Sequence, residues 1–390
     1  MKIRRLFIIL FCLNLLNYID RQVLYSVFPL LQRDLELSDW QLGALASAFM
    51  LVYMVYAPAV GYLADRFSRP RLIALSALLW SGATFACGAA AGFVSLLVPR
   101  ALIGVGEGGF TTIAQPFLAE HYPQEKHAPV LAAFGLALPI GSALGYVLGG
   151  LVGQHWGWRV AFMAVAVPGV FLAILAWTLL KDGKREVPNV PRPALRDYFP
   201  LFKNRPFLSV CFAQAMMTFV MGGLAAWMPM YLHRYANLDA AQAGTYFGTL
   251  VIVCGAAGTY AGGKLAARML ARSAEGYYKL IARCFLAALP CCWAVLCMTN
   301  AAGMLAFMGA ALTLLFMPTG AIAAALVATT DERIRSMAFA VNIFLIHLLG
   351  DALSPTLIGW VSDAWSLKAA VFCASLLLLP GAWVGRKAKS

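Results

Sequence analysis

Long apolar runs constrain this chain more than any other feature of its sequence. A helix needs about 20 apolar residues to cross a bilayer, and runs of that length recur through all 390 residues with short polar connections. Twelve spans would use about 240 residues, which leaves room for loops and one linker but for no extramembrane domain. Only 12% of the residues are charged, about half the share of a soluble domain. We therefore predict an all-α membrane protein and exclude a membrane-tethered soluble enzyme.

Twelve transmembrane helices in two six-helix bundles are the predicted architecture. The linker between the bundles is the stretch 181–205, which holds four prolines and seven basic residues. We expect an N-terminal bundle at 1–180 and a C-terminal bundle at 206–390. The spans are predicted at 6–31, 40–63, 72–92, 94–119, 128–153, 158–180, 206–231, 240–262, 279–299, 301–328, 335–361 and 367–385.

The distribution of basic residues predicts the orientation. Lysine and arginine concentrate in cytoplasmic loops of membrane proteins. Alternate loops of this chain place 24 of the 30 basic residues on one side, together with both termini and the linker. The other side holds Arg33, Arg159, Arg234 and Lys368. We expect a multi-pass cell-membrane protein with both termini cytoplasmic. Because the bases follow the loops and form no single polar face, the net charge of +13 does not indicate nucleic-acid binding.

The two predicted bundles echo each other in sequence. The stretch 61–66 (GYLADR) closes the second span, and 263–268 (GKLAAR) closes the eighth, 202 residues later. Two halves with the same polarity and the same loop motif indicate parallel repeats about an axis along the membrane normal.

Several stretches resemble a known transporter family. Residues 61–71 (GYLADRFSRPR) resemble the loop motif of the major facilitator superfamily, although Pro70 stands where a basic residue is usual. Arg100 with Gly104 and Gly106, and residues 139–145 (PIGSALG), resemble its motifs in spans 4 and 5. Within the superfamily the chain is similar to the Spinster lysolipid and sphingolipid transporters at 17–21 (NYIDR), 100–114 and 347–355 (HLLGDALSP). The resemblance implies the major facilitator fold and a transporter without enzymatic activity.

Ionisable residues inside the predicted spans are the first functional candidates, because a charge near the bilayer centre is costly. With a rise of about 1.5 Å per residue, Asp20 and Arg100 come at about the same depth, and Glu107 follows Arg100 on the same helix face. Together with Arg21 these groups form a buried set of two acids and two bases. A static salt bridge between spans 1 and 4 is the structural alternative. The resemblance implies proton-coupling roles for Asp20, Arg100 and Glu107.

Further candidates lie in the matched stretches and in the C-terminal half. His347 and Asp351 are four residues apart on one helix face, and His347 alternatively packs against a neighbouring carbonyl. We expect substrate contacts from Tyr18, Arg21, Arg100, Glu107, Thr111, Met217, Met221 and His347. We expect gating contacts from Asp65, Arg66, Arg69, Arg71, His347 and Asp351, the loop residues alternatively being simply solvated.

An asymmetry between the halves bears on the substrate. The offset of 202 residues between the repeats makes four positions of the second half equivalent to Asp20, Arg21, Arg100 and Glu107. These positions are Gly222, Gly223, Ala302 and Gly309, so the charged set has no counterpart in the second half. Span 7 offers methionines instead, which alternatively pack between helices. A site that is polar on one wall and apolar on the other suits an amphiphile, with its headgroup near Arg21 and Arg100 and its tail along the C-terminal half. We predict a monomeric, proton-coupled transporter of a lysophospholipid- or sphingolipid-like molecule among membrane lipids, with no cofactor or metal and the proton gradient as energy source. A proton-coupled symporter of small organic anions is the alternative.

Overall fold

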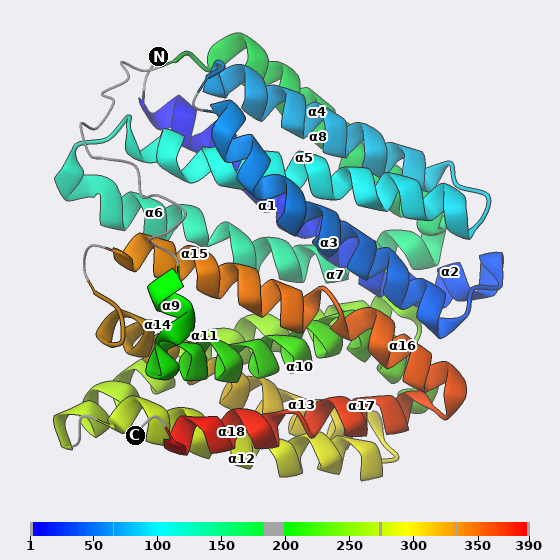
Figure 1. The fold of residues 1–390 in the computed structure, drawn as a ribbon. Helices are drawn as coiled ribbons and strands as arrows, with labels where there is room; N and C mark the ends of the chain where they lie inside the picture. The colour runs from blue at the N-terminus through cyan, green and yellow to red at the C-terminus, as the bar shows by residue number, and fades with distance from the viewer. Residues whose placement is uncertain (1–2, 65, 183–198, 273–274, 332–333, 388–390) are drawn as a thin grey trace. The chain divides into compact units, whose positions relative to one another are not determined.

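The computed structural model describes all residues except 1–2, 65, 183–198, 273–274, 332–333 and 388–390, and the described residues form helices joined by short turns and loops. Eleven helical segments in this part of the chain are long and apolar enough to cross a membrane, and a shorter apolar one covers Leu367–Trp383. The predicted all-α membrane fold with twelve spans is confirmed (Figure 1). Most of the predicted linker, residues 183–198, lies outside the described residues.

The chain divides into two compact units. The first contains Met1–Glu186 and also Met228–Thr249, and the second contains Val187–Trp227 and Leu250–Ser390. The division that the sequence predicts at the linker assigns residues 228–249 to the C-terminal bundle, whereas in the structure they group with the first unit. This segment is the end of one helix and the start of the next.

The first unit is built from long helices that pack side by side. They are α1 (Ile3–Ser26), α2 (Phe28–Leu35), α3 (Asp39–Ala64), α4 (Arg69–Gly88), α5 (Phe93–Ala119), α6 (His127–Gly135), α7 (Ala137–Trp156) and α8 (Trp158–Leu179). The main packing pairs are α3 with α5, α4 with α5 and α8, and α1 with α7. Helix α1 therefore packs against α7 while it also contacts α5, which brings the sequence-predicted polar residues of α1 and α5 into one unit.

The second unit holds the helices that follow the linker. They are α9 (Phe199–Lys203), α10 (Arg205–Ala236), α11 (Ala240–Arg272), α12 (Gly276–Cys297), α13 (Ala301–Phe316), α14 (Thr319–Ala328), α15 (Arg335–Ile346), α16 (Ser354–Ala364), α17 (Leu367–Ser375) and α18 (Leu378–Lys387), of which α10 and α11 continue into the first unit. Helix α12 packs against α13, α14, α17 and α18.

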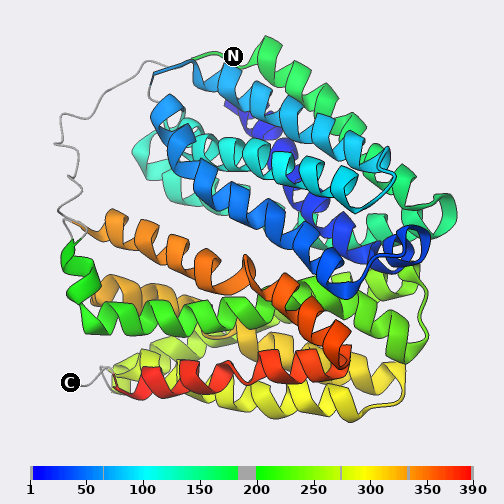
Figure 2. The ribbon, with the colours of Figure 1, turned by 45° about the vertical axis from the view of Figure 1, so that its right-hand side comes forward.

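Five predicted spans are interrupted, and each interruption lies next to a proline. Proline lacks the backbone N–H and clashes with the preceding turn. The breaks at Val27 and Leu136 come shortly before Pro29 and Pro139. The break at Met317–Pro318 includes its proline, and those at 347–353 and 376–377 come shortly before Pro355 and Pro380. In Figure 2 the break between α15 and α16 is visible in the orange part of the ribbon. Apolar length, from which the spans were predicted, does not locate these breaks.

Candidate functional site

Four charged side chains meet in the interior of the first unit. Asp20 and Arg21 come from α1, and Arg100 and Glu107 come from α5. Arg21 Nε lies 2.6 Å from Glu107 Oε2, and Arg100 Nη1 lies 3.6 Å from Asp20 Oδ1. The structure thus brings together the residues that the sequence placed in one set, and it sorts them into two ion pairs. Because each pair is neutral, the set is tolerable at low dielectric.

The two pairs differ in their access to solvent. Arg100 and Glu107 have fully buried side chains and that of Asp20 is 2% exposed, whereas that of Arg21 is 15% exposed. An incoming anion would therefore meet Arg21 before Arg100. The contact of Arg100 with substrate stays a prediction, and its side chain is fully buried in this structure.

Asp20 has an additional partner that the sequence did not indicate. Thr84 of α4 is fully buried, and its hydroxyl donates a hydrogen bond to Asp20 Oδ2. The carboxylate is thus held between the hydroxyl on one oxygen and the guanidinium of Arg100 near the other. Threonine is common in membrane helices, so nothing in the sequence alone distinguished Thr84.

Aromatic rings surround the Arg21 guanidinium. Its Cζ lies 5.3 Å from the ring centroid of Tyr18, 5.0 Å from that of Phe49 and 4.9 Å from that of Tyr53. A cation within about 6 Å of a ring face is attracted by the ring quadrupole. The hydroxyls of Tyr53 and Thr111 are 2.8 Å apart. Tyr18 and Thr111 were predicted site residues, whereas Phe49 and Tyr53 were missed, although their spacing of four residues places them on one face of α3.

Glycines allow the backbones around this cluster to approach closely. A Cβ on Gly104 of α5 would lie within 3.0 Å of Tyr53 N, and a Cβ on Gly141 of α7 would lie 2.6 Å from Leu15 O. Real Cβ atoms do not come this close to backbone atoms. The glycines of the matched motifs therefore set the spacing of α3 from α5 and of α1 from α7.

Several buried polar atoms of the cluster have no hydrogen-bond partner among the described residues. They include both amide atoms of Asn17, the three guanidinium nitrogens of Arg100 and Glu107 Oε1. Buried polar groups are normally satisfied by protein or by ordered water. Asn17 is fully buried and lies one turn before Arg21 on α1, so the cluster has polar capacity beyond its two ion pairs.

His347 and Asp351 form the main polar pair of the second unit that the sequence predicted. His347 Nδ1 lies 2.8 Å from Asp351 Oδ1, and both side chains are about one-fifth exposed, at 23% and 20%. The segment His347–Asp351 is a π-helical turn, inside which Gly350 departs from helical geometry at φ −108° and ψ −111°. Such π-turns are frequent at functional sites. A Cβ on Gly222 of α10 would come 3.0 Å from the Cα of Asp351, so glycine is needed opposite this turn.

The predicted gating loop is only partly described. Asp65 lies outside the described residues. Arg69 forms an ion pair with Glu120 at the end of α5, and its backbone N–H donates to Asp182 Oδ1 at 3.2 Å. The Arg66 guanidinium lies 4.0 Å from the Tyr62 ring centroid, and Arg71 is exposed. These contacts of Arg66 and Arg69 lie within the first unit.

The predicted methionine surface of α10 is mostly inside the protein. Met217 is 4% exposed, and Met221 is only half-buried. Packing between helices, the alternative considered from the sequence, therefore describes Met217 in this structure, and Met221 retains some accessible surface.

The comparisons with known proteins agree with one another. A family model described as Major Facilitator Superfamily matches residues 10–346. The chain is 30% identical over 373 residues to "Sphingosine-1-phosphate transporter SPNS2" of Mus musculus, covering 90% of this chain and 68% of the relative. It is 28% identical to "Probable sphingolipid transporter spinster homolog 2" of Arabidopsis thaliana, covering 95% of this chain and 84% of the relative. A crystal structure of a bacterial homolog to the human lysosomal transporter Spinster, in an inward-facing and unoccupied conformation, matches 99% of this chain and 96% of its own with a TM-score of 0.89 at 22% identity.

Proposed function

Because the chain belongs to the major facilitator superfamily and is a Spinster-like membrane transporter rather than an enzyme, we propose that it transports an amphiphilic lipid. We propose that this transport is coupled to the movement of protons. The proposed substrate is a lysophospholipid- or sphingolipid-like molecule with an anionic headgroup. The observation that carries the proposal is the Arg21–Glu107 pair, in which a partly exposed guanidinium is bound to a fully buried carboxylate.

The proposed coupling is an exchange of partners at Arg21. A phosphate or carboxylate headgroup can take a guanidinium in a two-pronged, charge-assisted contact. If the headgroup takes Arg21, Glu107 loses its cation inside a low-dielectric site, where an uncompensated charge is costly. Binding of a proton by Glu107 removes that cost. Headgroup and proton would then bind together and leave together, which is the requirement for coupled transport.

The second pair is proposed to have a different role. Arg100 and Asp20 are fully buried, and Thr84 holds the Asp20 carboxylate in place. We expect them to keep α1, α4 and α5 in register and to set the electrostatic environment of Glu107. Asn17 and the guanidinium nitrogens of Arg100, which have no hydrogen bond among the described residues, provide hydrogen-bonding capacity for water around the carboxylates.

The proposed lipid substrate rests on the chemistry of the first unit and on the relatives. The names of the most similar relatives state sphingosine-1-phosphate or sphingolipid transport. The ring cage around Arg21 gives one side of the site an apolar wall directly beside its cation, which suits a headgroup joined to an alkyl chain. The proposed orientation has both termini in the cytoplasm, as the basic residues predict.

Transport by purified protein in liposomes tests this function. Labelled lysophospholipids and a phosphorylated sphingoid base would be offered with and without a pH gradient. We expect saturable uptake that the gradient accelerates and that unlabelled lysolipid inhibits. Inhibition by small dicarboxylates but not by lysolipids would overturn the lipid assignment in favour of an organic-anion symporter.

A further inference from the structure

Helix α10 belongs to both units of the protein. Its residues up to Trp227 group with the second unit, whereas Met228–Ala236 and the start of α11, as far as Thr249, group with the first. This segment is continuous in sequence with the second six-helix half, so its grouping with the first unit depends on its tertiary contacts. We call residues 228–249 the crossover segment.

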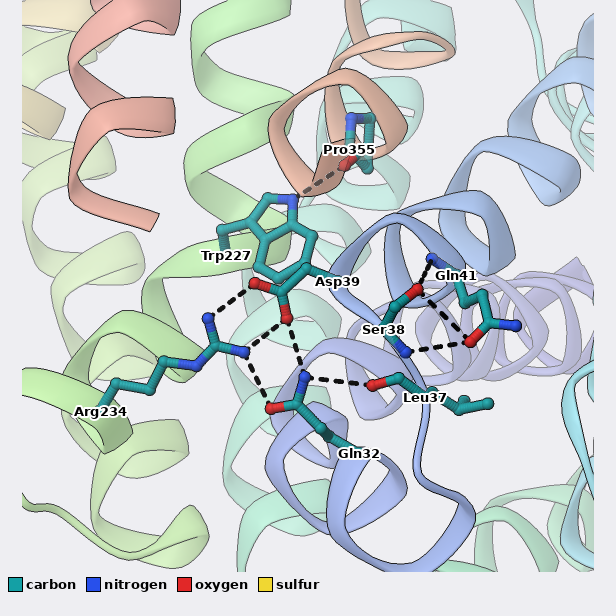
Figure 3. Close-up of polar contacts among 8 residues, drawn as sticks. All are labelled: Gln32, Leu37, Ser38, Asp39, Gln41, Trp227, Arg234 and Pro355. Atoms are coloured by element: carbon teal, nitrogen blue, oxygen red, sulfur yellow. Dashed lines mark hydrogen bonds and ion pairs between the residues drawn. The ribbon is translucent and has the colours of Figure 1, made fainter. Parts of the chain in front are cut away.

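An ion pair attaches the crossover segment to the first unit. Arg234 Nη1 donates to Asp39 Oδ2 at 2.7 Å, and Arg234 Nη2 donates to Gln32 Oε1 at 2.8 Å (Figure 3). Gln32 Nε2 in turn donates to Asp39 Oδ1 at 2.8 Å and to Leu37 O at 3.2 Å. The three side chains close a ring of contacts in which the guanidinium bonds both Asp39 oxygens, the two-pronged geometry that arginine favours.

Local structure fixes both partners of this pair. Ser38 N donates to Gln41 Oε1 at 2.9 Å and the Ser38 hydroxyl accepts from Gln41 N, so a capping box starts α3 directly at Asp39 (Figure 3). Asp39 thus lies in the first turn of α3, and Arg234 lies in the last turn of α10. Both positions favour the charge that they carry, because helix N-termini attract anions and C-termini attract cations.

A glycine seam runs beside the ion pair. Cβ atoms on Gly150 of α7 and on Gly248 of α11 would come 3.2 Å from Ala241 Cα and 3.0 Å from Ala143 O, respectively. The rings of Tyr146 and Phe247 meet edge to face with centroids 5.0 Å apart. The crossover segment therefore packs closely on α7 through these glycines and the ring contact.

The other part of α10 is anchored in the second unit. Trp227 is fully buried, and its Nε1 donates to Pro355 O at the start of α16 at 3.0 Å. Pro229 lies inside α10, between this anchor and Arg234. Proline weakens the helix at such a point and is a common site of bending. One helix thus has an anchor in each unit and a point of bending between them.

Solvent reaches the ion pair through a cavity of about 360 Å³. Gln32, Arg33, Gln154, Arg234 and Asp239 are among its lining residues. The side chain of Arg234 is 25% exposed, whereas that of Asp39 is 5% exposed. An ion pair that water can reach contributes little to stability. When this pair opens, water can solvate the Arg234 guanidinium, so opening does not leave both charges unsolvated.

We propose that Arg234, Asp39 and Gln32 form a releasable latch on the crossover segment, and that the latch opens in every transport cycle. The closed latch holds the end of α10 and the start of α11 against α2, α3 and α7. When it opens, the segment bends away at Pro229 and exposes the first unit at the side that the basic residues predict to be external. None of these three side chains was predicted as a gate from the sequence. The inference needs the protein to be a cycling transporter, but not a particular substrate.

A distance measurement tests the latch without substrate. Spin labels at Trp156→Cys on α7 and Asn237→Cys after α10 report the separation of the crossover segment, in a background in which the native cysteines are replaced. In Arg234→Gln we expect the distance distribution to gain a longer component that the protein with an intact latch lacks. Arg33→Gln is the matched control, because Arg33 lines the same cavity and its guanidinium pairs with its neighbour Asp34. This variant should leave the distribution unchanged. An unchanged distribution in Arg234→Gln would overturn the proposal.

Cross-linking tests whether opening is obligatory. With cysteines at Gln32 and Arg234, a short cleavable cross-linker should lower transport at least about tenfold, a long flexible one should leave most of it, and reductant should restore it. Equal transport with both cross-linkers would show that the segment does not need to separate. If lipid transport is missing even before cross-linking, the proposed substrate is wrong and the distance measurement still decides the latch. If Arg234→Gln folds poorly, Arg234→Lys keeps the charge that the end of α10 favours but loses the two-pronged contact with Asp39, and it should also show the longer component.

Discussion

The two units carry their polar groups in very different surroundings. The first unit buries four charges on α1 and α5 as two ion pairs. The second has glycines or alanine at the positions that the repeat offset makes equivalent, and its His347–Asp351 pair lies on a π-turn with both side chains partly exposed. Repeats of the same fold therefore supply different properties. The first buries its charges almost completely in ion pairs, whereas the second keeps its pair partly exposed at the break between α15 and α16.

The largest expected effect is on stability in the first unit. Arg100→Ala leaves Asp20 buried without its cation, and we expect a loss of about 3–5 kcal/mol in the free energy of unfolding. Thermal unfolding in detergent measures this loss. The double variant Arg100→Ala with Asp20→Asn should recover most of it, because the uncompensated charge is gone. A single variant as stable as the wild type would show that the pair contributes little.

Removal of the buried acid should abolish coupling. Glu107→Gln is nearly isosteric, keeps a hydrogen-bonding group beside Arg21 and cannot exchange a proton. We expect pH-driven accumulation of lipid to disappear while exchange between equal pools on the two sides persists. Uptake into liposomes with and without a pH gradient separates these activities. Unchanged pH dependence in both Glu107→Gln and Asp20→Asn would contradict the proposed coupling.

A conservative change at Arg21 should affect binding more than turnover. Arg21→Lys keeps the positive charge but loses the planar guanidinium that stacks among Tyr18, Phe49 and Tyr53. We expect the KM for a phosphorylated lipid to rise about tenfold. Arg159→Lys is a matched control, because Arg159 stacks on Trp158 away from the cluster. Equal effects of the two substitutions would remove Arg21 from the headgroup site.

The smallest effect is expected in the second unit. Asp351→Asn removes the charge of a pair that is partly exposed, and such pairs contribute about 0–1 kcal/mol to stability. We expect the transport rate to change by a factor of about three or less and the coupling to pH to remain. If Asp351→Asn instead removes pH coupling as Glu107→Gln does, the contrast between the two units is wrong.

The sequence predicted the spans and the buried charges well, for identifiable physical reasons. Apolar length determines whether a helix crosses the membrane, and the cost of burying charge makes Asp20, Arg21, Arg100 and Glu107 conspicuous. The pairing of Arg21 with Glu107 was not predicted, because helical depth and face do not determine side-chain direction. Phe49 and Thr84 were missed because aromatic and hydroxyl residues are common in such helices.

The crossover segment was missed for a different reason. A division at the linker follows from composition, whereas the attachment of 228–249 to the first unit depends on tertiary contacts such as Arg234 with Asp39. When basic residues are counted to predict orientation, a base in an external loop contributes to that count and indicates nothing about its contacts. The unusual position of Arg234 on the side with few bases was the one available indication.

Proton uptake during substrate binding tests the central claim most directly. Purified protein in weakly buffered detergent with a pH indicator would be mixed with lysophospholipid in the absence of any gradient. If the headgroup displaces Glu107 from Arg21, wild-type protein should take up about one proton for each lipid bound, and Glu107→Gln should bind lipid without taking up that proton. Equal proton uptake by the two proteins, or lipid binding by the wild type with no uptake, would contradict the account.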